Sequence, residues 1–210
     1  MQEFEDYLAT ITIPPNPFRN LDNSLPTDLP LAGHVTGSRF GEAGQPMPNG
    51  NALRALEDTY RPFDRGIDRG VFACVTCHTL PTGMGSNSSL NFINFLPILP
   101  GPNGEKHHAL VSVDGSTQRS FKIPQTRTMY DKMGFDMTSR RSRSGFGFLH
   151  DGSVDGLSRF LSESAFEPDD NQEVADLVAL MLAFGGSEFP GSPDAFEPPG
   201  TASKDAHAAV

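Results

Sequence analysis

The sequence contains no tryptophan and only two cysteines in 210 residues. Positive charge is also scarce, because 16 Lys and Arg stand against 26 Asp and Glu, a formal net charge of -10. Nucleic-acid binding needs a concentrated positive surface, and the one basic cluster is Arg140, Arg141 and Arg143. No apolar run approaches the ~18 residues of a membrane span. We therefore expect neither a nucleic-acid partner nor a membrane span.

The two cysteines stand three positions apart, and a histidine follows the second, in the stretch FACVTCHTLP at 72–81. Cys74, Cys77 and His78 form C-x-x-C-H, the attachment signature of c-type haem. On a helical turn this spacing places both sulfurs along one porphyrin edge, where they can add to the two vinyl groups. The imidazole of the next residue can then bind the iron. The motif predicts one covalent haem c on Cys74 and Cys77, with His78 as the proximal ligand.

Other uses of a C-x-x-C pair fit the surrounding sequence less well. A zinc site needs four ligands, and no second cysteine pair is present. A thioredoxin-like redox pair would be followed by a longer helix, whereas Pro81 and Gly83 end any helix within a turn. A disulfide across two intervening residues would close too small a loop to stabilise much.

The compartment follows from the haem. Covalent haem ligation takes place outside the bacterial cytoplasm, so we expect a periplasmic or secreted location. The acidic start Met-Gln-Glu-Phe-Glu-Asp has no apolar segment of the kind found in signal peptides, so any export signal would lie upstream.

Proline placement predicts three regions. Residues 1–49 are expected to be an extended, Pro-rich lead-in with a helix-like start at EFEDYLATI. Residues 50–187 are expected to form a cytochrome c-like haem domain, and residues 188–210 a flexible Pro/Gly/Ala tail.

Three helices and one hairpin are expected. The helices lie at 49–63, capped by Asn51, at 155–163, and at 169–184 with an Asp170–Glu173 capping box. LVSVDGSTQRSFKI at 110–123 can form a hairpin around Asp114-Gly115. The predicted fold is mainly α, a class I cytochrome c-like domain with long irregular loops. The residues expected on the apolar helix faces are Leu53, Leu56 and Tyr60 in the first helix and Val174, Leu177, Val178, Met181 and Phe184 in the last.

Three further stretches resemble one family. FKIPQTR (121–127), GFGFLHDGSVDGLSRF (145–160) and EVADLVALMLAF (173–184) are similar to the C-terminal, electron-transfer half of bacterial di-haem cytochrome c peroxidases, roughly over residues 50–187. The resemblance implies that Arg127 neighbours a haem propionate, whose negative charge its guanidinium suits. It also implies that His150 and Asp151 brace the loop on the distal side.

The chain departs from that family in ways that bear on function. It has one haem motif rather than two, and no tryptophan for the relay between haems. The family's distal methionine lies just beyond the helix that follows H-D-G-S, and SESAFEPDDNQ at 162–172 contains none. The sixth iron ligand must therefore come from elsewhere.

An insertion at 129–144, MYDKMGFDMTSRRSRS, supplies three methionines. K-M-G-F resembles the ligand loops of class I cytochromes, so Met133 is the preferred distal ligand. Met137 and His150 are alternatives, while Met129 lies too close to Arg127 to reach the iron. Met133 as ordinary core filler is an equally good reading, because flexible thioethers fit irregular gaps.

These features predict a single-electron carrier, an electron-transfer domain of a larger periplasmic or secreted protein. Its partner would be a redox protein or an adjoining domain of the same chain. The alternatives are a peroxidase-like haem enzyme and a haem-based sensor of NO or CO, both of which require an open distal site.

Overall fold

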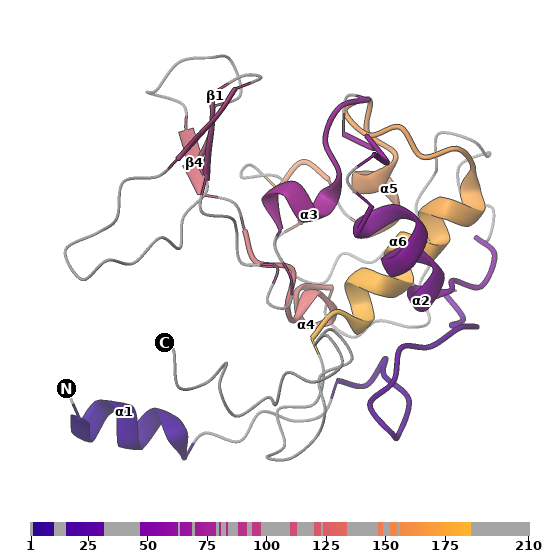
Figure 1. Cartoon of the computed structure of the whole chain (residues 1–210). Helices are drawn as coiled ribbons and strands as arrows, with labels where there is room; N and C mark the ends of the chain where they lie inside the picture. Colours follow the sequence, from indigo (N-terminus) through magenta and orange to yellow (C-terminus); the bar gives the residue numbers. More distant parts are fainter. Residues whose placement is uncertain are drawn as a thin grey trace.

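The computed structural model describes residues 2–10, 16–31, 47–62, 64–68, 70–78, 80, 83, 88–91, 94–97, 110–112, 120–122, 124–133, 147–148, 152–154 and 156–185. Its helices are α1 (Gln2–Ala9), α2 (Ala52–Arg54), the π-helical η1 (Ala55–Tyr60), α3 (Cys74–Cys77), α4 (Met129–Lys132), α5 (Leu157–Leu161) and α6 (Asn171–Ala183). Its strands are β1 (Ser88–Asn91), β2 (Asn94–Pro97), β3 (Leu110–Ser112) and β4 (Ser120–Lys122). Figure 1 shows the strands to one side of the helices.

Helix α6 begins at the predicted capping box. The Asp170 side chain accepts a hydrogen bond from the Glu173 backbone N–H at 2.9 Å. The reciprocal bond lies one residue earlier than in the standard box, because Glu173 Oε2 accepts from the Asp169 N–H at 2.6 Å. The two bonds satisfy donors that the first turn of a helix leaves without partners.

Helix α6 is covered on all sides rather than along one stripe. Every residue from 174 to 183 is buried, including Asp176, and α2, η1, α4 and α5 all pack against it. Figure 1 shows α6 running through the middle of the helical region. The predicted apolar residues of this helix are buried as expected. The prediction was too narrow, because the opposite face is buried as well.

The helical stretch before the haem motif is continuous but changes geometry. The Asn51 side chain caps it by accepting from the Arg54 N–H at 2.8 Å, as predicted. Its second half is π-helical, and the Arg61 N–H bonds the Leu56 carbonyl five residues back. The residues buried along this stretch are Ala52, Ala55, Leu56, Thr59 and Tyr60.

The expectation that Leu53 lies on the buried face was wrong. Leu53 is 39% exposed, and the smaller Ala52 is buried instead. The backbone around residues 50–52 lies close to α6, so only a small side chain fits on the buried face here. At the neighbouring Gly50, an added Cβ would lie only 2.6 Å from the Ala179 Cβ.

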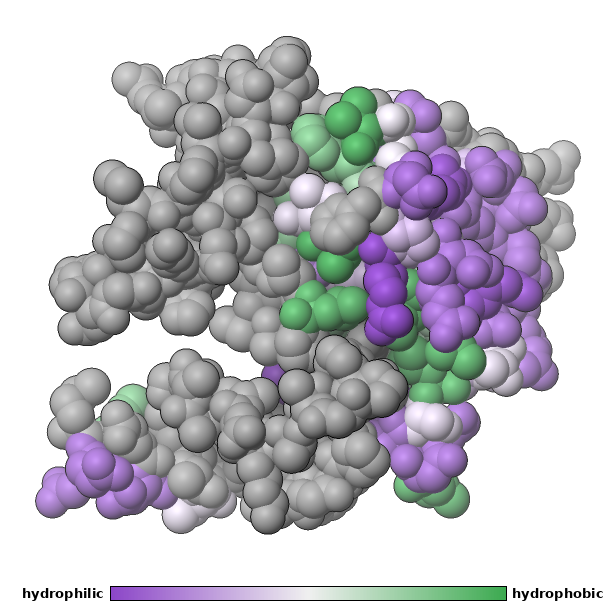
Figure 2. All heavy atoms as spheres, in the orientation of Figure 1, coloured by the Kyte–Doolittle hydropathy of each residue, from purple (hydrophilic) through white to green (hydrophobic). Residues whose placement is uncertain are grey.

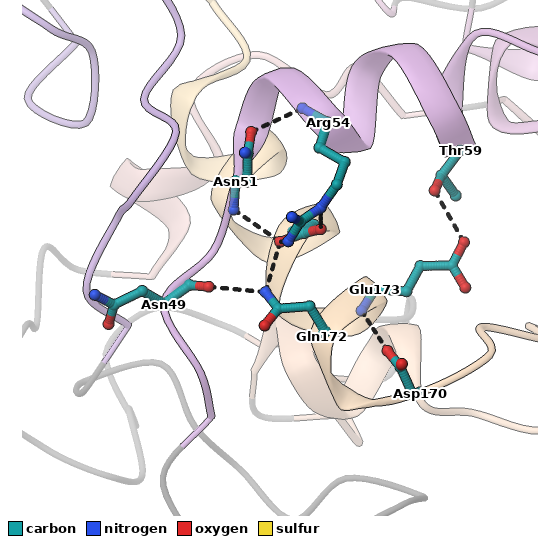
Figure 3. Close-up of polar contacts among 8 residues, drawn as sticks. Asn49, Asn51, Arg54, Thr59, Asp170, Gln172 and Glu173 are labelled. Carbon is teal, nitrogen blue, oxygen red and sulfur yellow. Dashed lines mark hydrogen bonds and ion pairs between the residues drawn. The ribbon is translucent and has the colours of Figure 1, made fainter.

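An ion pair and several hydrogen bonds join this stretch to α6 (Figure 3). Asp176 is 3% exposed and accepts from the Arg54 guanidinium, with Nη2 to Oδ1 at 2.9 Å. The Asn51 backbone N–H and Gln172 Nε2 also donate to Asp176 Oδ1, at 2.8 and 2.9 Å. A buried carboxylate needs such partners, because removing one leaves an uncompensated charge.

A second ion pair lies one turn earlier in α6. Glu173 Oε1 accepts from Thr59 Oγ1 at 2.9 Å, and Glu173 Oε2 accepts from Arg65 Nη2 at 2.7 Å. Together the two pairs tie the N-terminal half of α6 to the residues that precede the haem motif.

Part of the predicted lead-in belongs to the packed unit. Asn16 Nδ2 donates to the Leu182 and Gly185 carbonyls at 2.9 and 2.8 Å, and Arg19 Nε donates to the Ala183 carbonyl at 2.6 Å. These donors satisfy carbonyls that the end of a helix leaves free, and the arginine charge suits the negative end of the helix dipole. Other residues of this segment join the hydrophobic core, namely Phe18, Leu25 and Leu31. The boundary predicted at residue 50 therefore does not follow the packing. The helix-like start is α1.

The strands form one four-stranded sheet in the order β2-β1-β3-β4. Antiparallel β3 and β4 pair Ser112 with Ser120, so the two predicted strands do pair. The expected turn residues Asp114 and Gly115 lie outside the described residues. The register leaves residues 113–119 between the strands, which is longer than a two-residue Asp-Gly turn. Antiparallel β1 and β2 form a second hairpin that was not predicted, because its two-residue connection Phe-Ile carries no Gly, Asn or Asp turn signal. Strands β1 and β3 run parallel.

The surface in Figure 2 is largely hydrophilic over the helical region, with scattered apolar residues. The large apolar side chains exposed in the described residues are Phe4, Tyr7, Leu21, Leu53 and Val71. Within the described ranges, no helix has the length and apolarity needed to cross a membrane.

We expect Asn16→Ala to destabilise the protein by roughly 1–3 kcal/mol, because it leaves two carbonyls at the end of α6 without their donor. Thermal unfolding followed by circular dichroism measures the effect. The control is Asn49→Ala, which removes an exposed bond to Asp28 and should cost within about 0.5 kcal/mol. Equal melting temperatures for the two variants would show that the Asn16 side chain does not stabilise the end of α6.

Candidate haem site

The C-x-x-C-H motif forms the single helical turn α3. Ala73 precedes it in an extended conformation, and the His78 N–H closes the turn on the Cys74 carbonyl at 2.8 Å. Positions i, i+3 and i+4 share one face of a helix. Cys74, Cys77 and His78 are therefore on the same side of the turn. The helix ends after Cys77, as Pro81 and Gly83 predicted.

The imidazole of His78 is held by a backbone carbonyl. His78 Nδ1 lies 3.3 Å from the Gly83 oxygen. Because a carbonyl oxygen can only accept, this contact assigns the proton to Nδ1 and leaves the lone pair on Nε2. Metal-binding histidines are commonly oriented in this way by their second nitrogen.

The protonation state of His78 also suits metal binding. Burial lowers its pKa, and hydrogen bonding to the backbone of Gly83 and Pro124 opposes the shift without reversing it. The ring is therefore neutral at pH 7, the form that coordinates a metal ion.

Both thiols are kept protonated. Burial raises the pKa of Cys74 to about 12, and the nearby carboxylates of Asp68 and Glu173 add to the effect. Burial likewise raises the pKa of Cys77 to about 11. Redox-active C-x-x-C pairs depend on the opposite shift, since the thiolate is their reactive form. The two cysteines form no disulfide.

Gly83 allows the chain to pass close to the core beside His78. Its φ is +61°, a left-handed conformation that favours glycine. An added Cβ would lie 2.8 Å from the Phe184 ring and would collide with Thr126 Oγ1. Gly83 is thus confined between the start of the segment that leads to α4 and the end of α6.

Arg127 lies beside the end of α6. An added Cβ at Gly185 would lie 3.5 Å from Arg127 Nε. Its neighbour Thr126 is buried against Gly83, the residue that holds His78. Arg127, the residue expected at a haem propionate, therefore follows a residue that packs against Gly83. The Gly83 carbonyl in turn faces the His78 ring.

Of the candidates for the distal ligand, some are described by the structure and others are not. Met133 follows the last residue of α4, is 1% exposed and belongs to the hydrophobic core. Met129 packs partly buried against the same core. Met137, His150 and Asp151 lie outside the described residues.

Two site residues were not recognised in the sequence. Tyr60 was expected only on an apolar helix face, yet its hydroxyl donates to the His78 carbonyl at 2.7 Å. Burial raises the pKa of Tyr60 above its usual value, so the hydroxyl keeps its proton. Phe184 packs on Tyr60 with ring centroids 5.5 Å apart. Both contacts join distant segments, so no local pattern marks them.

The residues present fit a covalently bound haem. Two protonated thiols share a face with a neutral imidazole that is hydrogen-bonded through Nδ1, and a half-buried arginine lies nearby. Among the described residues, no group of three or more His, Cys, Asp and Glu could hold a metal ion by itself.

We expect Gly83→Ala to cost at least about 2 kcal/mol, combining left-handed strain with collision against Thr126 and Phe184. Gly70→Ala is the matched control. Gly70 has a similar φ of +67°, but an added Cβ would meet only Glu167 Oε2 at 3.5 Å, so strain alone of roughly 1–2 kcal/mol applies. Thermal unfolding compares the two, and an equal loss of stability would contradict the crowding at Gly83.

No family model, curated protein or solved structure matches this chain. The function is therefore inferred from the geometry of the residues around α3.

Proposed function

We propose that this protein is a single-electron carrier with one c-type haem attached to Cys74 and Cys77 and ligated by His78. The observation that carries the proposal is the α3 turn itself, with His78 Nδ1 at 3.3 Å from the Gly83 carbonyl. The raised pKa values of both thiols disfavour the competing reading of this pair as a redox-active dithiol.

The packing of the two flanking helical stretches also supports this proposal. In the class I cytochrome arrangement, the helix before the haem motif packs across the last helix. Here α2 and η1 pack against α6, and Tyr60 of η1 contacts Phe184 at its end.

Each residue has a definite task in this proposal. When bound, haem supplies iron that exchanges one electron between its ferrous and ferric states. Cys74 and Cys77 attach the porphyrin to α3, so it cannot dissociate. His78 offers Nε2, and Arg127 supplies positive charge for a propionate. The partner would be a redox protein or an adjoining domain, in the periplasm or outside the cell.

The burial of Met133 supports a second candidate function. A methionine that is 1% exposed within the core already has apolar neighbours, as core filler would. If it remains there, the distal side is open unless Met137 or His150 binds the iron. The protein would then be a peroxidase-like enzyme or a sensor of NO or CO.

We expect the intact mass of the chain, exported in a host with c-type haem ligation, to include one haem after acid–acetone extraction. Covalent thioether bonds survive this extraction, whereas non-covalent haem is removed. The double variant Cys74→Ser/Cys77→Ser should show the bare polypeptide mass. A wild-type chain that also shows the bare mass would overturn the proposal.

We expect Met133→Leu to abolish the weak long-wavelength absorption band that sulfur ligation gives ferric haem. Leucine keeps the apolar volume, so packing changes little while the thioether is lost. Met129→Leu is the control and should keep the band, as measured by ultraviolet–visible spectroscopy of the ferric protein. A band that persists in both variants would exclude Met133, and a wild-type protein without any band would favour the open-site candidate.

A further inference from the structure

His78 ends the helical turn α3, and its backbone leaves the helical region there, with φ -104° and ψ 76°. Carbonyls at the end of a helix have no partner within the helix and need one from elsewhere. The hydroxyl of Tyr60 supplies it, at 2.7 Å from the His78 oxygen. The bond crosses from the helical stretch before the motif to the motif itself.

The Tyr60 side chain is held rigidly in this position. Tyr60 is 0% exposed, and its ring packs on Phe184 at a tilt of 52°. It stands at the end of η1, where the wider π-helical turn bonds Arg61 to Leu56. Isolated π-helical turns occur often at functional sites. The neighbouring Thr59 faces α6 instead, through its bond to Glu173.

The imidazole ring of His78 is oriented with the help of Phe184, the aromatic partner of Tyr60. Phe184 lies against Gly83, whose carbonyl faces His78 Nδ1 at 3.3 Å. The backbone of His78 is therefore anchored by Tyr60, and its ring is oriented by a residue packed against Phe184. The two anchors come from η1 and from the end of α6, which pack on each other.

We propose that Tyr60 is a positioning residue for His78, whose hydroxyl anchors the ligand's backbone and so sets the orientation of its imidazole. This role rests on the proposed haem function. Without the hydroxyl, the His78 carbonyl loses its buried donor and must turn toward another partner, at a cost typical of an unsatisfied polar group. The carbonyl carbon is bonded to the Cα that carries the imidazole, so a new position of this carbonyl changes the His78 backbone from which the ring projects.

The test compares Tyr60→Phe with Thr59→Val in the haem-loaded full chain. Both variants delete one buried hydroxyl from η1 and keep the side-chain shape, but only the first touches His78. The readouts are the midpoint potential and the paramagnetic proton NMR shifts of the haem methyls and His78 β-protons in the ferric state. These shifts depend on the orientation of the axial imidazole.

We expect Tyr60→Phe to shift the potential and these resonances, while Thr59→Val lowers the melting temperature and leaves them at wild-type values. Retained haem with wild-type resonances in Tyr60→Phe would overturn the positioning role alone. Equal shifts in both variants would overturn it too, because they would reveal a general effect of η1 stability. A wild-type chain without covalent haem would overturn the proposed function, and the positioning role with it.

Should Tyr60→Phe yield no folded protein, 3-fluorotyrosine incorporated at position 60 provides the same test. Fluorine makes the phenol a stronger hydrogen-bond donor and keeps the ring in place. The His78 resonances should then move from their wild-type positions, whereas 3-fluorotyrosine at position 7, on the exposed face of α1, should leave them unchanged. Unmoved resonances at position 60 would overturn the proposal.

Discussion

The burial of α6 from residue 174 to residue 183 is the constraint on which the rest of the helical region depends. Elements on several sides must cover this helix, and the Asp176 carboxylate inside it needs a positive partner and hydrogen-bond donors. Arg54 and Gln172 meet that need, together with the backbone N–H of Asn51. Because a buried carboxylate without partners is strongly destabilising, these contacts determine the position of α2 and η1 on the helix surface.

The position of α3 follows from that of η1. The haem motif is a single turn and too short to be stable alone, since isolated helices shorter than about 12 residues are marginal in water. Within the described residues, α3 packs on η1, and the Tyr60 hydroxyl joins the two. A substitution that alters the packing of η1 on α6 would therefore also move His78, even if no residue of the C-x-x-C-H motif is changed.

Local features of the sequence were predicted well. The caps at Asn51 and Asp170 depend on side chains bonding backbone groups three residues away, so short patterns reveal them. The spacing of Cys74, Cys77 and His78 likewise requires only one helical turn. The Asp-Gly signal at 114–115 predicted that the flanking strands β3 and β4 pair, but not their register, which leaves residues 113–119 between them.

Features that depend on distant partners were missed. Leu53 is more hydrophobic than Ala52, yet the small residue is buried because the chain approaches α6 closely. Asn16 and Arg19 lie in a Pro-rich stretch without helical periodicity. Their side chains donate to carbonyls at the end of α6, and this contact can be recognised only once the two segments are known to be neighbours. The hydroxyl of Tyr60 cannot be paired with His78 until η1 and α3 are in contact.

The capping of α6 by Asn16 links residues 166 positions apart in the chain. Such a contact closes a very long loop, and chains dominated by distant contacts fold slowly. During synthesis, the segment at 16–31 is made before α6 and has no helix end to bind until residue 185 has been added. The α3 turn is also made well before α6 can hold η1 in place. The two cysteines therefore remain on an open polypeptide until α6 has been made, and the core closes around them last.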